Sequence, residues 1–225
     1  MNVLVSGGAS GLGAAVVAAL RSDGDRAMVL DKQAPAAEVA DFRMVDVSDS
    51  AATEDAVRDL AEHCAAPEAV VTAAGTDSCG PFGSVPTSDW ERVIQVNLLG
   101  TAAVVRAALP YLERAHGRVI TVASTLGLRV AGDATAYCAS KFAVVGFTRA
   151  LAMELAGRVG VTLVVPGGMR TRFFDGRPEQ YRPPDESRLL PPEHVAAAIV
   201  GVLRQPAGCE VRELVVCHEQ EPSWP

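Results

Sequence analysis

The chain has 225 residues, of which 49% are hydrophobic and 21% are charged. This composition excludes an intrinsically disordered chain, which has low hydrophobicity and high net charge. The formal net charge of −7 argues against a general nucleic-acid binder, whose surface is usually basic. We expect a cytoplasmic protein, because no apolar run approaches the ~18 residues of a membrane span and the first residues carry no basic signal-peptide region. The five cysteines and four histidines are scattered without the spacing of metal ligands, so we expect reduced thiols and no metal site.

Apolar runs of strand length alternate along the chain with longer segments in which apolar residues recur at helical spacing. In chain order we expect a strand over 3–6, a helix over 12–21, strands over 27–31 and 42–47, a helix over 51–63, a strand over 69–73, a helix over 88–114, a strand over 118–124, a helix over 135–157, a strand over 161–165, a helix over 191–204 and a strand over 211–217. Pro110 should bend or break the third of these helices. Residues 168–190 hold several prolines and mixed charges, which predict a loop or lid, and residues 219–225 are expected to form a loose tail.

Continuous apolar strands between helices indicate a parallel sheet that is covered on both faces. Right-handed crossovers then give a doubly wound α/β fold, with a sheet of about seven strands and helices on both sides. No repeat or linker divides the chain, so we expect a single domain over residues 1–225. Open sheets of this kind bind ligands at the carboxyl ends of their strands.

The first predicted strand is followed by a glycine-rich turn that reads Ser6-Gly7-Gly8-Ala9-Ser10-Gly11-Leu12-Gly13 and opens the first predicted helix. Glycines there allow a tight turn and a close backbone approach to a pyrophosphate, while the helix N-terminus adds free N–H groups and partial positive charge. The alternative is an ordinary glycine turn. The position of the motif in the fold favours a dinucleotide-binding turn formed by Gly7, Ser10, Gly11, Leu12 and Gly13.

Asp31 ends the second predicted strand, 18 positions after Gly13. An acidic residue about 20 positions past such a turn commonly hydrogen-bonds the hydroxyls of an adenosine ribose, and its charge repels a 2′-phosphate. Ser10 is uncharged and offers no basic partner for that phosphate, whereas Lys32 is a mild contrary sign. The pattern predicts NAD in preference to NADP; the alternative is an ordinary acidic residue in a turn.

Tyr137 and Lys141 share one face of the fourth predicted helix, because they lie four positions apart. A phenol has a pKa near ~10, and an ammonium group within a few Å would favour the phenolate and lower that pKa. A phenol of lowered pKa can exchange protons at neutral pH. The chain has only three tyrosines and two lysines, which disfavours the alternative of an accidental surface pair.

Two polar residues are placed to join this pair. Ser124 ends the fifth predicted strand, thirteen positions before Tyr137, so its hydroxyl can meet the phenol. Asn97 lies within the third predicted helix, where asparagine is unfavourable. Its side chain either bonds neighbouring backbone or holds a water on a proton path.

Together these residues resemble the short-chain dehydrogenase/reductase family, in its compact single-domain branch, over essentially the whole chain. The glycine turn is similar to the family's Thr-Gly-x-x-x-Gly-x-Gly cofactor motif, with Ser6 in place of threonine. The residues Asn97, Ser124, Tyr137 and Lys141 are similar in order and spacing to its catalytic tetrad. The resemblance implies a Rossmann fold with a general acid/base at Tyr137, a lysine that lowers its pKa and holds the nicotinamide ribose, a serine that orients the substrate oxygen, and an asparagine that positions a water.

The resemblance also implies contacts to the rest of the cofactor, made by Asp46, Val47, Ala74, Gly75, Pro166, Gly167 and Thr171. Asp46 and Val47 would contact adenine, and the last three would lie beside the nicotinamide carboxamide. The chain departs from the family where it has Thr72-Ala73-Ala74-Gly75 instead of Asn-Asn-Ala-Gly.

These features predict an NAD-dependent oxidoreductase acting on a secondary alcohol or its ketone. The alternatives are a non-catalytic dinucleotide sensor or scaffold on the same fold, and a nucleotide-sugar epimerase, for whose substrate domain the chain has no room. The expected pocket walls are loop 76–82, Leu126, Met169 and Phe173. The arginines of 168–190 could recognise an anionic substrate, but the acidic residues among them favour pairing within the same loop. The partners expected are a small-molecule substrate and further copies of the chain, in a homodimer or homotetramer, with no nucleic acid or membrane.

Overall fold

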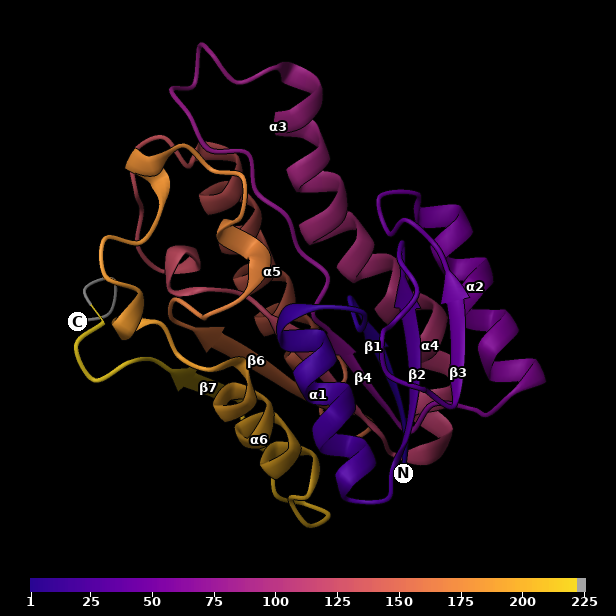
Figure 1. Cartoon of the computed structure of the whole chain (residues 1–225). Helices are drawn as coiled ribbons and strands as arrows, with labels where there is room; N and C mark the ends of the chain where they lie inside the picture. The colour runs from indigo at the N-terminus through magenta and orange to yellow at the C-terminus, as the bar shows by residue number, and fades with distance from the viewer. Residues whose placement is uncertain (222–225) are drawn as a thin grey trace.

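Seven short apolar segments pair as a parallel sheet in the order β3-β2-β1-β4-β5-β6-β7. The computed structural model describes residues 1–221 and gives these strands as β1 (Asn2–Ser6), β2 (Arg26–Asp31), β3 (Asp41–Met44), β4 (Ala69–Thr72), β5 (Arg118–Val122), β6 (Gly160–Pro166) and β7 (Glu213–Val216). The chain winds from β1 toward β3 and then returns to place β4 on the other side of β1, which confirms the predicted doubly wound fold. Ser6 is in register with Leu30 of β2 and Thr72 of β4, so these strands end together at one edge (Figure 1).

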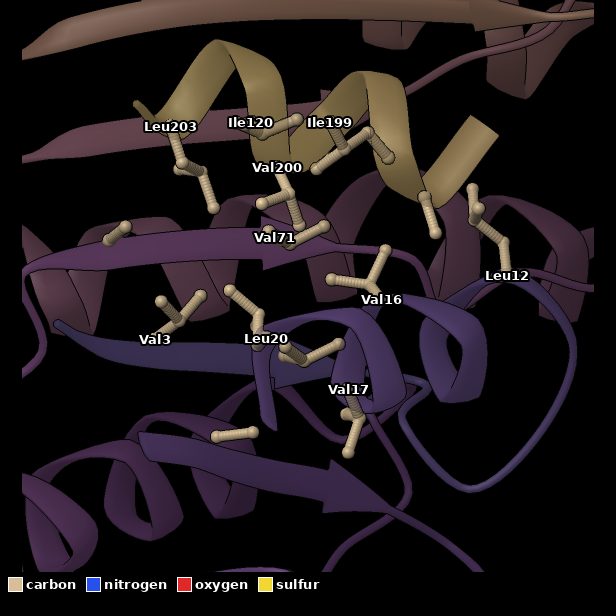
Figure 2. Close-up of a cluster of buried hydrophobic side chains, with 14 of the residues drawn as sticks. Val3, Leu12, Val16, Val17, Leu20, Val71, Ile120, Ile199, Val200 and Leu203 are labelled. Carbon is tan, nitrogen blue, oxygen red and sulfur yellow. The ribbon is translucent and has the colours of Figure 1, made fainter. Parts of the chain in front are cut away.

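Helices cover both faces of the sheet because alternate strand residues point to opposite sides. Val3 and Val5 of β1 pack under α1 (Gly11–Ser22) and α6 (Pro192–Leu203), as Figure 2 shows for Val3 and its neighbours. Leu4 packs on the other face. That face is covered by α2 (Ser50–His63), α4 (Thr101–Ala115) and α5 (Thr135–Glu154).

The helix expected over 88–114 is not a regular α-helix. It begins as α3 (Thr87–Ile94), passes through a π-helical turn, η1 (Gln95–Gly100), and continues as α4. Pro110, which was expected to bend or break the helix, lies inside α4 and does not break it. The ring is exposed to solvent, where water can hydrogen-bond the backbone carbonyl that proline leaves without a donor.

The same helical stretch also bears on the expectation that no apolar segment is long enough to span a membrane. Thr87–Ala115 has the length and composition of a membrane-crossing helix. However, 56% of its most apolar window is buried inside the fold. By its packing it is therefore a core helix that lies on the sheet.

Strand β3 is shorter than expected, ending at Met44 instead of residue 47. The Asp46 carboxylate accepts hydrogen bonds from the backbone N–H and the hydroxyl of Ser48, which turns the chain away from the sheet. The segment 168–190, hereafter the lid, holds three short turns, η3 (Arg172–Phe174), η4 (Glu179–Tyr181) and η5 (Glu186–Arg188). Of the expected tail over 219–225, residues 222–225 lie outside the described part of the chain.

Candidate active site

A cleft of about 1040 Å³ lies at the carboxyl ends of the strands. Its volume is at the upper end of the ~300–1000 Å³ of common small-ligand pockets, which suits a dinucleotide together with a small substrate. The predicted site residues that line it are Gly7, Ser10, Gly11, Leu12, Asp31, Asp46, Val47, Ala74, Gly75, Ser124, Tyr137, Lys141, Pro166, Gly167 and Thr171. Gly13 and Asn97 lie behind its surface, where they shape the wall.

The glycine turn between β1 and α1 needs glycine for two separate reasons. Gly7 and Gly11 have positive φ angles of 74° and 53°, a region that L side chains rarely adopt. Gly13 is helical, but a Cβ there would lie 2.1 Å from the carbonyl oxygen of Gly7. The Ser10 side chain makes no capping hydrogen bond and the first turn of α1 carries no acidic residue. The N-terminus of α1 therefore presents backbone donors that no side chain of its cap blocks, and it fits a phosphate group.

Asp31 joins the glycine turn to the end of β2. Its carboxylate accepts hydrogen bonds from the backbone N–H of Ala9 at 2.9 Å and of Gln33 at 3.0 Å. The Asp31 carboxylate thus stabilises both turns through backbone hydrogen bonds, and the residue also lines the cleft. Beside it, the Arg92 guanidinium donates to Asp46 at 2.7 Å. Although burial opposes it, hydrogen bonding by Arg92 and Ser48 lowers the pKa of Asp46 to about 2.

Three of the residues proposed for catalysis come from two neighbouring segments, the turn after β5 and helix α5. Ser124 follows β5 and caps the turn η2 (Thr125–Gly127), and its Oγ accepts a hydrogen bond from the Leu126 N–H at 3.1 Å. Tyr137 and Lys141 lie on α5, with the lysine Nζ 5.6 Å from the centre of the tyrosine ring. The same Nζ donates to the Val122 carbonyl at the end of β5, at 2.9 Å. The structure thus brings Ser124, Tyr137 and Lys141 together.

Burial decides the acid–base properties of this pair. It raises the pKa of Tyr137 to about 12, although a hydrogen bond with Ser124 lowers it in part. Burial also lowers the pKa of Lys141 to about 8. The expectation that the ammonium group depresses the phenol pKa is therefore wrong for the chain by itself. The reason is that both groups are desolvated and the ammonium is directed at the Val122 carbonyl.

Asn97 does not bond neighbouring helix backbone. Its Oδ1 accepts from the Thr76 N–H at 2.8 Å, and its Nδ2 donates to the Thr76 carbonyl at 2.9 Å. The same Nδ2 donates to Ser140 Oγ at 2.9 Å, and Ser140 Oγ donates to the Tyr137 carbonyl at 2.8 Å. Asn97 therefore links the loop after β4 to the helix that carries Tyr137.

Sequence reasoning missed Ser140, although a polar residue three positions after Tyr137 on an apolar helix was a signal. It also missed Asp77 and Arg177. The expectation that the lid arginines pair within the lid is wrong for Arg177, which forms an ion pair of 2.8 Å with Asp77 in the loop after β4. The expected wall residues Leu126, Met169 and Phe173 do line the cleft.

Residues 1–182 match the sequence model of the family described as short chain dehydrogenase. The chain belongs to the short-chain dehydrogenase/reductase family. One relative is the 2-dehydro-3-deoxy-L-rhamnonate dehydrogenase (NAD(+)) of Sphingomonas sp. (strain SKA58), 34% identical over 186 residues, which are 78% of this chain and 75% of the relative. This short-chain dehydrogenase is accordingly an oxidoreductase that acts on alcohols with a nicotinamide dinucleotide.

Solved structures of two dehydrogenases share the fold. Thermoplasma acidophilum aldohexose dehydrogenase superposes with a TM-score of 0.87 at 23% identity, covering 96% of this chain and 91% of that one. Alcohol dehydrogenase from Thermococcus sibiricus, complexed with 5-hydroxy-NADP, superposes with a TM-score of 0.86 at 24% identity, covering 97% and 96%. Within residues 1–221 of this short-chain dehydrogenase, no group of three or more His, Cys, Asp or Glu side chains is placed to hold a metal ion.

Proposed function

We propose that this short-chain dehydrogenase interconverts a secondary alcohol and its ketone, uses NAD(H) in preference to NADP(H), and employs Tyr137 as the general acid/base. The observation that carries the proposal is the convergence of Tyr137, Ser124 and Lys141 in the cleft that the glycine turn also lines. A protein that only binds a dinucleotide has no need of a phenol beside a serine hydroxyl in this cleft.

The hydroxyls of Ser124 and Tyr137 would together hold the substrate oxygen, and Tyr137 would give that oxygen a proton or take one from it. Lys141 keeps its charge at neutral pH, since its pKa is about 8. The bound nicotinamide supplies the hydride acceptor or donor.

Replacing Tyr137 with phenylalanine tests the proton-transfer role. We expect Tyr137→Phe to bind NADH with unchanged affinity, measured by fluorescence titration, and to lose turnover by about 10³-fold or more, because the phenol oxygen alone is removed. The matched control is Tyr111→Phe, on the outer part of α4, which should keep full turnover. A loss below about tenfold in Tyr137→Phe would contradict the role. NADH binding without turnover of any alcohol by the native chain would favour the sensor or scaffold.

The preference for NAD rests on the charge of Asp31 at the end of β2, and Asp31→Asn tests it. The amide keeps an oxygen that can accept from Ala9 but removes the negative charge that repels a 2′-phosphate. We expect the native chain to bind NADH at least about tenfold more tightly than NADPH, and the variant to lose most of this difference. Equal affinities in the native chain, or an unchanged ratio in the variant, would refute the assignment.

A further inference from the structure

A buried ion pair ties the lid to the loop after β4. Arg177 Nη2 lies 2.8 Å from Asp77 Oδ2, and the two side chains are only 15% and 7% exposed. The other carboxylate oxygen of Asp77 accepts the Ser78 N–H at 2.7 Å, so both oxygens are satisfied. By contrast, the ion pair between Arg188 and Asp185 lies wholly within the lid and is 52% and 46% exposed.

Aromatic rings place this pair next to the reacting tyrosine. The Arg177 guanidinium lies 4.7 Å from the centre of the Phe173 ring and 4.8 Å from that of Phe174. Phe173 in turn packs on Tyr137, with ring centres 5.4 Å apart. All these residues line the cleft, so the ion pair forms part of the wall that a substrate meets.

We propose that the Asp77–Arg177 pair holds the lid against the cleft and makes the lid end of the cleft selective for uncharged parts of the substrate. This proposal rests on the function proposed above. A substrate carboxylate at Arg177 must either displace Asp77, which leaves a buried carboxylate without a counter-charge, or share the guanidinium with Asp77, which leaves a net negative charge in the buried cluster. A substrate ammonium group would compete with Arg177 for Asp77 and would leave the buried guanidinium without a counter-charge. Because an unpaired buried charge is strongly unfavourable, substrates charged at this end bind poorly while the pair is intact.

Removing one charge should reverse the selectivity in a direction set by the charge that remains. The test uses three ketones of one chain length that end in a methyl, a carboxylate or an ammonium group, and measures kcat/KM for each. We expect the native chain to prefer the methyl compound by about tenfold or more over both charged ones. Asp77→Asn leaves Arg177 unpaired and should raise the carboxylate-to-methyl ratio about tenfold, while Arg177→Gln leaves Asp77 unpaired and should raise the ammonium-to-methyl ratio about tenfold.

The exposed pair within the lid supplies matched controls. Asp185→Asn and Arg188→Gln remove the same kinds of charge where water screens them, so both should leave the three ratios within about twofold of the native chain. A purely structural effect would lower kcat/KM for all three ketones in parallel. Such a parallel loss, or a native preference for a charged ketone, would overturn the proposed selectivity.

Limited proteolysis separates failure of this proposal from failure of the proposed function. If no ketone is reduced with either cofactor, the proposed function fails, but the lid contact can still be measured. Chymotrypsin is suitable because its target side chains Phe173, Phe174 and Tyr181 are the same in all four variants. We expect Asp77→Asn and Arg177→Gln to be cleaved in the lid at least about fivefold faster than the native chain and the two controls. Equal rates would show that the pair does not hold the lid.

Discussion

Lys141 carries a cation at a buried position, and the protein is less stable for it. Its Nζ keeps one hydrogen bond with the Val122 carbonyl, but burial lowers its pKa from 10.5 to about 8. At neutral pH the folded chain must hold the charged form, which costs about 3 kcal/mol relative to an unperturbed lysine. A charge placed at such a cost is common at sites where chemistry requires it.

This cost predicts a pH-dependent difference between the native chain and Lys141→Met. The folded-state pKa is depressed, so between pH 8 and 10.5 the unfolded chain holds a proton that the folded chain has lost, and stability rises with pH. Relative to Lys141→Met, the native free energy of unfolding should increase by about 2 kcal/mol from pH 7 to pH 10. Urea unfolding at the two pH values measures it. Lys32→Met, at the exposed second lysine, is the control and should show no such change; a pH-independent difference for Lys141→Met would contradict the assigned cause.

At the residue scale, the sequence predicts which reactive side chains come together but not how their pKa values shift. Spacing alone puts Tyr137 and Lys141 on one helix face, and strand ends put Ser124 beside them. The pKa directions depend on how completely β5 and the lid cover these groups, which no spacing in the sequence records.

Among the elements, the π-helical turn between α3 and α4 matters most to the site. It holds Asn97 where the amide reaches both backbone groups of Thr76 and the hydroxyl of Ser140. Thr101 Oγ1 donates to the Asn97 carbonyl, and a Cβ on Gly100 would lie 2.6 Å from the Val47 carbonyl oxygen. The sequence pattern shows a helix here and an unfavourable asparagine within it. It does not show the widened turn, because that turn is stabilised by partners distant in the chain.

The hydrogen bonds that Asn97 makes from this turn predict that Asn97→Ala is much less stable than the native chain. The change leaves the partly buried Thr76 N–H and carbonyl and the buried Ser140 hydroxyl each short of one partner, so we expect the free energy of unfolding to fall by about 3 kcal/mol. Asn2→Ala is the matched control, because the Asn2 side chain donates one exposed hydrogen bond, of 3.3 Å to the Ala66 carbonyl, and its loss should cost under about 0.5 kcal/mol. Guanidinium unfolding compares the two. Similar losses in both variants would mean that the buried bridge contributes little.

Over the whole molecule, the strand order follows from the pattern of continuous apolar strands between helices, since right-handed crossovers leave few other arrangements. The contact between the lid and the loop after β4 does not follow from this pattern of strands and helices. Asp77 and Arg177 are separated by 100 positions, and several other arginines of the lid have the same charge. Only the folded chain shows which one is covered by aromatic rings and paired with Asp77.

Assembly is the remaining property of the whole molecule, and we propose a homodimer or homotetramer that packs through the outward face of α5. This face carries Phe142 and Met153 eleven positions apart, and the Met153 side chain is 81% exposed. Large apolar residues aligned on one helix face indicate a surface that is covered in solution.

A charge on this face should separate the subunits. We expect the native chain to sediment at two or four times the mass of one chain, and Phe142→Glu/Met153→Glu to sediment as a monomer, because burying two carboxylates without partners is strongly unfavourable. Val130→Glu is the control: Val130 is 76% exposed but lies in the loop before α5, so its charge should leave the assembly intact. A native monomer in analytical ultracentrifugation at micromolar concentration, or an assembled double variant, would rule out α5 as the interface.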